Sequence, residues 1–156
     1  INIDPTASKS NRRLTIADNT TVLGQTAPGE GITIAGASTK FSGENIIVRY
    51  LRIRLGDGYD QDAATATGKN IVIDHCTFNW GVDETFTAKE LINTSIQYNI
   101  IANSLSIVNK NGDEAHEDKG IHAPATQKGK REQRLAVTAR HDELVIDRVS
   151  QKGNNK

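Results

Sequence analysis

The sequence of 156 residues contains no methionine, one cysteine and few aromatic side chains. The single cysteine, Cys76, cannot form a disulfide within the chain, so packing and hydrogen bonds must stabilise the fold. No apolar run approaches the ~20 residues that a membrane-spanning helix needs, and we expect no membrane partner. Because the chain starts at Ile1 and has no Met, we expect its N-terminus to arise by processing or truncation.

Neither sign of charge is in excess, since 19 Lys and Arg residues balance 19 Asp and Glu residues. A neutral chain gives no general reason to expect nucleic acid or an anionic membrane surface as a partner. It leaves room for a local basic groove that binds an acidic polymer. The apolar residues are mostly Ile, Val, Leu and Ala, a composition that favours stacked strands over a helix bundle.

Short β-branched runs recur along the chain, at residues 32–34, 46–48, 71–73 and 94–97. The last three runs begin at Ile46, Ile71 and Thr94, so the steps between them are nearly equal, and turn-forming Gly, Asn, Asp and Thr fill the intervals. A repeat of this size predicts a solenoid, in which each coil buries its inward residues against its neighbours. A β-sandwich is the alternative, although sandwiches space their strands more tightly.

Polar residues beside these strands offer a further stabilising device. Amide side chains can stack in ladders from coil to coil, and the candidates are Asn70, Asn79, Asn93 and Asn99. We predict one solenoid domain over residues 1–150 and a disordered tail over 151–156.

Three blocks resemble motifs of the secreted pectate lyases, at residues 24–32, 45–57 and 70–84. The blocks occur in the expected order, and the resemblance extends from about Thr15 to Ser104. It implies an all-β fold, a right-handed parallel β-helix (solenoid), present here as a partial set of coils. It also implies a secreted, extracellular enzyme that cleaves polygalacturonate by calcium-dependent β-elimination.

That reaction requires carboxylates that converge on one cleft, because Ca²⁺ takes ~6–8 oxygen ligands. The resemblance implies that Asp60, Asp62 and Asp83 bind calcium, with Glu84 as a fourth ligand. Asp60 and Asp62 are separated by a single residue and share a face of an extended segment. The alternative is that both are ordinary turn residues beside Gly56.

The resemblance also implies cations that hold the anionic substrate. Arg52 and Arg54 are candidates, although they could instead pair with acidic residues of adjacent coils. Lys119 is a candidate for substrate binding and for catalysis. The base that removes the C5 proton is an arginine in this family, and the nearest candidates here are Arg148 and Arg140.

The chain departs from the family pattern after His141, where no Arg-x-Pro-Arg sequence follows. This departure motivates a second hypothesis, a catalytically defective β-helix that binds acidic polysaccharide or has a structural role. A third hypothesis is a β-helix hydrolase with paired carboxylic acids. No capping segment is evident, so we also expect self-association through exposed coil ends.

Four further residues of the third block attract attention. Asp74 and His75 could act as an acid–base pair, but we favour a structural role in which they bond to neighbouring coils. Cys76 is expected to pack inside as a small hydrophobe. Trp80 could stack on a sugar, but packing beside a turn is the favoured interpretation.

Overall fold

The computed structural model describes residues 1–3, 12–56, 61–105, 119–122, 134–140 and 143–150, and for the last three ranges it describes the backbone only. Within these ranges almost all regular structure is β-strand, and the described residues contain one short 3-10 helix, η2 (Gly24–Thr26). The strands are β1 (Arg13–Ile16), β2 (Thr21–Leu23), β3 (Ile32–Ala35), β4 (Ser38–Arg49), β5 (Leu51–Arg54), β6 (Ala64–Asp74), β7 (Thr77–Asn79), β8 (Glu84–Ile92), β9 (Ser95–Ala102), β10 (Lys119–His122), β11 (Arg134–Arg140) and β12 (Glu143–Ser150).

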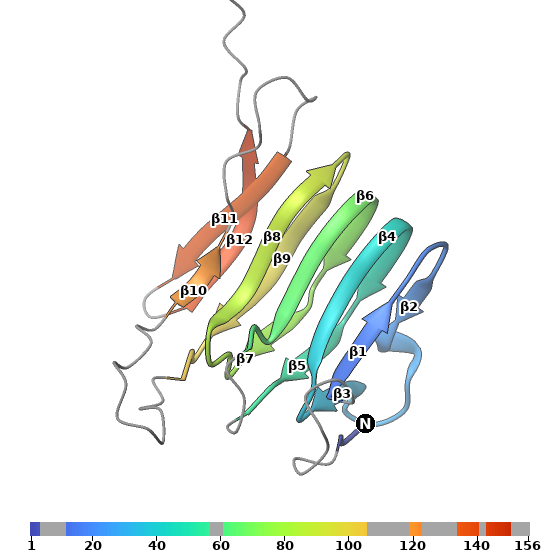
Figure 1. The fold of residues 1–156 in the computed structure, drawn as a ribbon, viewed down its shortest axis with the longest axis vertical. Coiled ribbons are helices and arrows are strands. Elements are labelled where there is room, and N and C mark those ends of the chain that lie inside the picture. The colour runs from blue at the N-terminus through green and yellow to red at the C-terminus, as the bar shows by residue number, and fades with distance from the viewer. Residues whose placement is uncertain (4–11, 57–60, 106–118, 123–133, 141–142, 151–156) are drawn as a thin grey trace, which may run out of the picture.

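Successive coils stack through parallel strand pairs, which confirms the predicted β-solenoid (Figure 1). One stack runs from β1 through the first half of β4 and of β6 to β8 and β10. A second joins β2, the second halves of β4 and β6, and the start of β9. A third consists of β3, β5, β7 and the end of β9.

The predicted repeat is confirmed by the register of the strands. Ile46 lies opposite Ile71, the first residues of two of the β-branched runs, and Val72 lies opposite Ser95 in the next run. The inward columns are apolar because side chains alternate between the two faces of a strand. One such column contains Ile34, Ile53, Phe78 and Ile101, all buried.

Asparagines in the left-handed conformation turn the chain between the first and second stacks. Asn19, Asn45, Asn70 and Asn93 have φ values of 51–58°. Their side chains form a ladder in which each Nδ2 donates to the Oδ1 of the preceding coil, over 2.6–2.9 Å. Asparagine tolerates this backbone conformation better than other non-glycine residues do.

The ladder contains only two of the four predicted asparagines, Asn70 and Asn93. The prediction was wrong for the other two, which are buried and bond to backbone of the adjacent coil. Asn79 donates to the Ala102 carbonyl (3.0 Å), and Asn99 accepts from the Cys76 N–H (2.7 Å). Each side chain thus satisfies a backbone group inside the coil.

The last two strands depart from the parallel pattern. β12 pairs antiparallel with both β11 and β9, whereas β11 pairs parallel with the start of β9.

The predicted tail, residues 151–156, lies outside the described residues, and the single domain over 1–150 stays a prediction. In the described part of the chain, no helix has the length and apolar character needed to cross a bilayer.

The ladder gives a test of how the corners are stabilised. Asn70→Ala removes two side-chain hydrogen bonds and places alanine in the left-handed region, so we expect a loss of about 2–3 kcal/mol of unfolding free energy. Asn70→Gly removes the same bonds without the backbone penalty and should cost less. Urea unfolding of the two variants measures both effects, and an equal loss would show that the backbone conformation contributes nothing.

Candidate functional site

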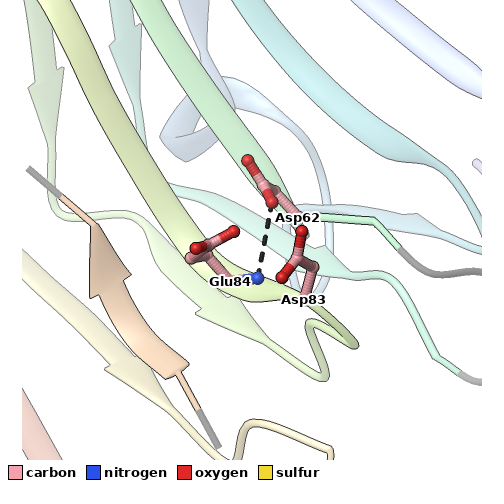
Figure 2. A group of neighbouring side chains, drawn as sticks. All are labelled: Asp62, Asp83 and Glu84. Carbon is pink, nitrogen blue, oxygen red and sulfur yellow. Dashed lines mark hydrogen bonds between the residues drawn. The ribbon is translucent and has the colours of Figure 1, made fainter. Parts of the chain in front are cut away.

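Three carboxylates meet where the chain enters β6 and β8. Asp62 lies just before β6, and Asp83 and Glu84 lie at the start of β8 (Figure 2). Ala64 pairs with Phe86, and the same alignment, continued back along both segments, brings Asp62 level with Glu84. One carboxylate oxygen from each of the three residues lies within 4.8 Å of the others. The resemblance to the pectate lyases implied Asp62, Asp83 and Glu84 as ligands, and the fold brings all three together.

Backbone hydrogen bonds hold the two acidic segments against each other. The Gln61 carbonyl accepts from the N–H groups of Val82 (3.1 Å) and Asp83 (3.2 Å). The Glu84 N–H points to Asp62 Oδ1 at 3.4 Å, which is the dashed line in Figure 2. A Cβ at Gly81 would lie 2.4 Å from the Glu84 carbonyl oxygen, so this tight turn requires glycine.

Two acids of the cluster line a cleft of about 300 Å³ that also has basic lining residues. Asp62 and Asp83 line it together with Arg13, Lys40 and Lys89. Thr65 donates to Asp62 Oδ2 (3.1 Å) and fixes one acid on the cleft wall. A site of this kind can hold a cation and an anionic ligand at the same time.

The cluster fits a calcium ion by its donor chemistry. Ca²⁺ binds oxygen at ~2.3–2.6 Å, so two oxygens on one ion lie at most about 5 Å apart. The three carboxylates satisfy this limit and would supply part of the ligand set. Backbone carbonyls, water or a substrate carboxylate would complete it.

Six cleft residues were missed by sequence reasoning: Arg13, Ser38, Lys40, Gln61, Thr65 and Lys89. Gln61 is 7% exposed, and its buried Nε2 has no hydrogen-bond partner among the described residues. Its place directly before Asp62 was the available signal. Arg13 and Lys40 come from earlier coils, and only the strand register brings them to the acids.

The remaining predicted site residues have different positions. Asp60 lies outside the described residues. Lys119 begins β10 in register with Glu84, one coil beyond the acidic cluster. Arg140 ends β11 and Arg148 lies in β12, two strands that stack on β9 rather than on β8. The catalytic assignment of these three cations stays a prediction.

Arg52 and Arg54 lie on β5, and neither lines the acidic cleft. Arg52 pairs with the Glu30 carboxylate (3.7 Å) and donates to the Glu30 carbonyl, as the pairing interpretation expected. Arg54 donates to the carbonyls of Ile53 (3.1 Å) and Thr77 (3.4 Å). Partial burial, and then the neighbouring Arg52 charge, lower the pKa of Arg54.

Asp74 and His75 bond to neighbouring coils, which supports a structural role. Asp74 is 3% exposed and accepts from Arg49 Nε and from the His75 ring, both at 2.7 Å. The His75 ring stacks between Tyr50 (4.8 Å between centroids) and Tyr98 (5.1 Å). These rings form a second ladder at the next corner of the coil.

Cys76 and Trp80 follow in the same block. Cys76 packs inside as expected, and burial raises the pKa of its thiol to about 11. Trp80 is partly exposed, and the Arg54 guanidinium lies 5.9 Å from the centre of its ring system. Trp80 therefore packs on a cation beside the turn.

Comparison with known proteins confirms the resemblance to the pectate lyases. Proteins named probable pectate lyase C are 46% identical in Aspergillus flavus and 45% identical in Emericella nidulans, each over 98 residues. The protein of that name in Neosartorya fischeri is 42% identical over 102 residues. The matches cover 60–62% of this chain but only 23–24% of the relatives, so the chain spans about a quarter of their length. No protein-family model matches the chain.

Cys76 tests the packing of this coil. Because the pKa of the buried thiol is near 11, only about one molecule in 1,000 carries a thiolate at pH 8. A disulfide reagent should therefore label Cys76 only as fast as the protein opens, and within seconds in denaturant. The labelling rate is followed by absorbance with and without urea. Full labelling of the native protein on mixing would contradict this packing.

Proposed function

We propose that this chain carries the calcium- and uronate-binding coils of a pectate lyase, which cleaves polygalacturonate by β-elimination outside the cell. The observation that carries the proposal is the Asp62–Asp83–Glu84 cluster, two acids of which line a cleft together with three basic side chains. The names of the relatives support the substrate class. Neutral net charge supports an interaction confined to this groove rather than a general affinity for nucleic acid.

We assign different roles to the acidic and the basic residues at this site. Asp62, Asp83 and Glu84 would hold calcium, with Asp60 as a proposed further ligand. An ion held by these carboxylates would supply positive charge beside a uronate carboxylate of the substrate, which would make the proton on C5 more acidic. Arg13, Lys40 and Lys89 would bind the neighbouring uronate groups, because ammonium and guanidinium groups pair with carboxylates.

A base must then take the C5 proton while the sugar on C4 leaves. Lys119 is the candidate favoured by position, because its strand β10 continues the stack that carries Glu84. Arg140 and Arg148 are the further candidates. Arg52 and Arg54 would act, if they bind substrate, outside the acidic cleft.

A second function is favoured by a specific observation. β11 and β12, which contain Arg140 and Arg148, stack on β9 and not on the strands that line the cleft. A β-helix with this arrangement binds polygalacturonate without cleaving it if Lys119 does not serve as the base. Self-association through unpaired coil edges is a further proposal for such a segment.

Calcium binding tests the cluster directly. Asp83→Asn replaces a charged carboxylate oxygen by a neutral amide oxygen, so we expect at least tenfold weaker Ca²⁺ binding by calorimetry. The stabilisation by Ca²⁺ in thermal unfolding should fall in parallel. Glu90→Gln is the matched control, since Glu90 is exposed and lies outside the cluster. Equal calcium affinity in both variants would rule out the cluster as the site.

Activity tests the lyase assignment. On polygalacturonate at alkaline pH, we expect unsaturated uronate ends with Ca²⁺ and none with chelator, followed by absorbance. Lys119→Ala should lower the rate at least 100-fold and leave the calcium affinity unchanged. Lys69→Ala should change neither the rate nor the calcium affinity, because Lys69 pairs with Glu44 (2.7 Å) away from the cleft. Binding without product would favour the second function, and saturated product would indicate a hydrolase.

A further inference from the structure

A second cavity of about 350 Å³ lies at another corner of the coil. Its walls come from the segment 24–31, from the corner residues Tyr50 and His75, and from Arg52 of β5 and Thr77 of β7. It shares no lining residue with the acidic cleft. Its volume falls in the range of small-molecule sites, and of its lining residues only Arg52 has been named above as a candidate for substrate binding.

Three polar groups from two successive coils line this cavity. Arg52 and Thr77 are register partners on β5 and β7, so their backbones are one strand spacing apart, ~4.8 Å. His75 uses Nδ1 to contact Asp74, which leaves its Nε2 without a hydrogen-bond partner among the described residues. The cavity therefore offers a guanidinium, a hydroxyl and an imidazole nitrogen to one ligand.

The charge of Arg52 is available to such a ligand. Among the described residues its carboxylate partner is Glu30, at 3.7 Å, and the Glu30 side chain is 96% exposed. An ion pair in that setting contributes little to stability. A ligand carboxylate can displace the Glu30 carboxylate while the Glu30 carbonyl continues to orient the guanidinium.

The walls are built to keep their shape. The rings of Tyr50 and His75 stack at 4.8 Å, and the buried Asp74 holds the imidazole. A Cβ at Gly24 would lie 2.2 Å from the Tyr50 carbonyl oxygen, so the 24–31 segment sits directly on this corner. Aromatic, hydroxyl and cationic groups in one preformed cavity suit an acidic sugar better than a bare anion.

We propose that this cavity is a second saccharide site, in which Arg52 binds the carboxylate of a uronate and Thr77 and His75 bind its hydroxyl groups. The uronate identity rests on the function proposed above, but occupancy of the cavity does not need calcium or the acidic cluster. A polymer bound there and in the cleft would be held at two points of the same coils, which raises its effective concentration at the cleft.

The test uses the whole chain with the acidic cluster disabled by Asp62→Asn and Asp83→Asn, in chelator. A galacturonate trimer should still bind and shift the backbone amide signals of Gly31, Arg52 and Thr77 in NMR titration. Arg52→Gln should weaken this binding at least tenfold. Lys69→Gln, which makes the same charge change on an exposed pair, should leave it unchanged.

Thr77→Val is the second variant, since it keeps the side-chain shape and should weaken trimer binding severalfold. Loss of binding in the cluster-disabled chain, equal weakening by Lys69→Gln, or equal affinity for inorganic phosphate would overturn the second site. The proposed lyase function fails separately: it fails if the unmodified chain shows no calcium-dependent product, whatever the trimer does in chelator.

Discussion

In-register stacking of the coils is the constraint on which every other feature depends. The backbone pairs between β4 and β6, and between β6 and β8, fix which residue of one coil lies above which residue of the next. A slip of one residue would turn inward side chains outward and would separate Asp62 from Glu84. The apolar columns and the acidic cluster therefore share one cause, and core packing positions the site.

The corners keep this register because their side chains and backbone fit only in one alignment. The asparagine ladder and the Tyr50–His75–Tyr98 stack repeat the same backbone conformation once per coil. Glycine also keeps the register where two coils approach closely. A Cβ at Gly68 would lie 1.9 Å from the Gly43 carbonyl oxygen, so neither a larger residue nor a shifted register is tolerated there.

Sequence reasoning predicted the parts of this structure that repeat. The β-branched runs at 46–48 and 71–73 indicated the solenoid and its period, because inward residues of parallel coils must be apolar. Asn79 and Asn99 were misassigned because nothing local distinguishes a ladder amide from one that bonds buried backbone. The resemblance implied Asp62 and Asp83, which the fold brings close together, whereas Lys40 and Arg13 could not be predicted, since only three-dimensional register places them in the same cleft.

Strand direction also explains why the position of the proposed base is less well defined than the acidic cluster. Columns continue only while strands add in parallel, and β10 extends the column of Glu84 to Lys119. β12 reverses direction on β9, so residue order along it runs opposite to that of the earlier coils. Among the described strands, β10 is therefore the one whose column position suits the proposed base. The direction of the last strands, rather than the acidic cluster, is therefore what separates the two proposed functions.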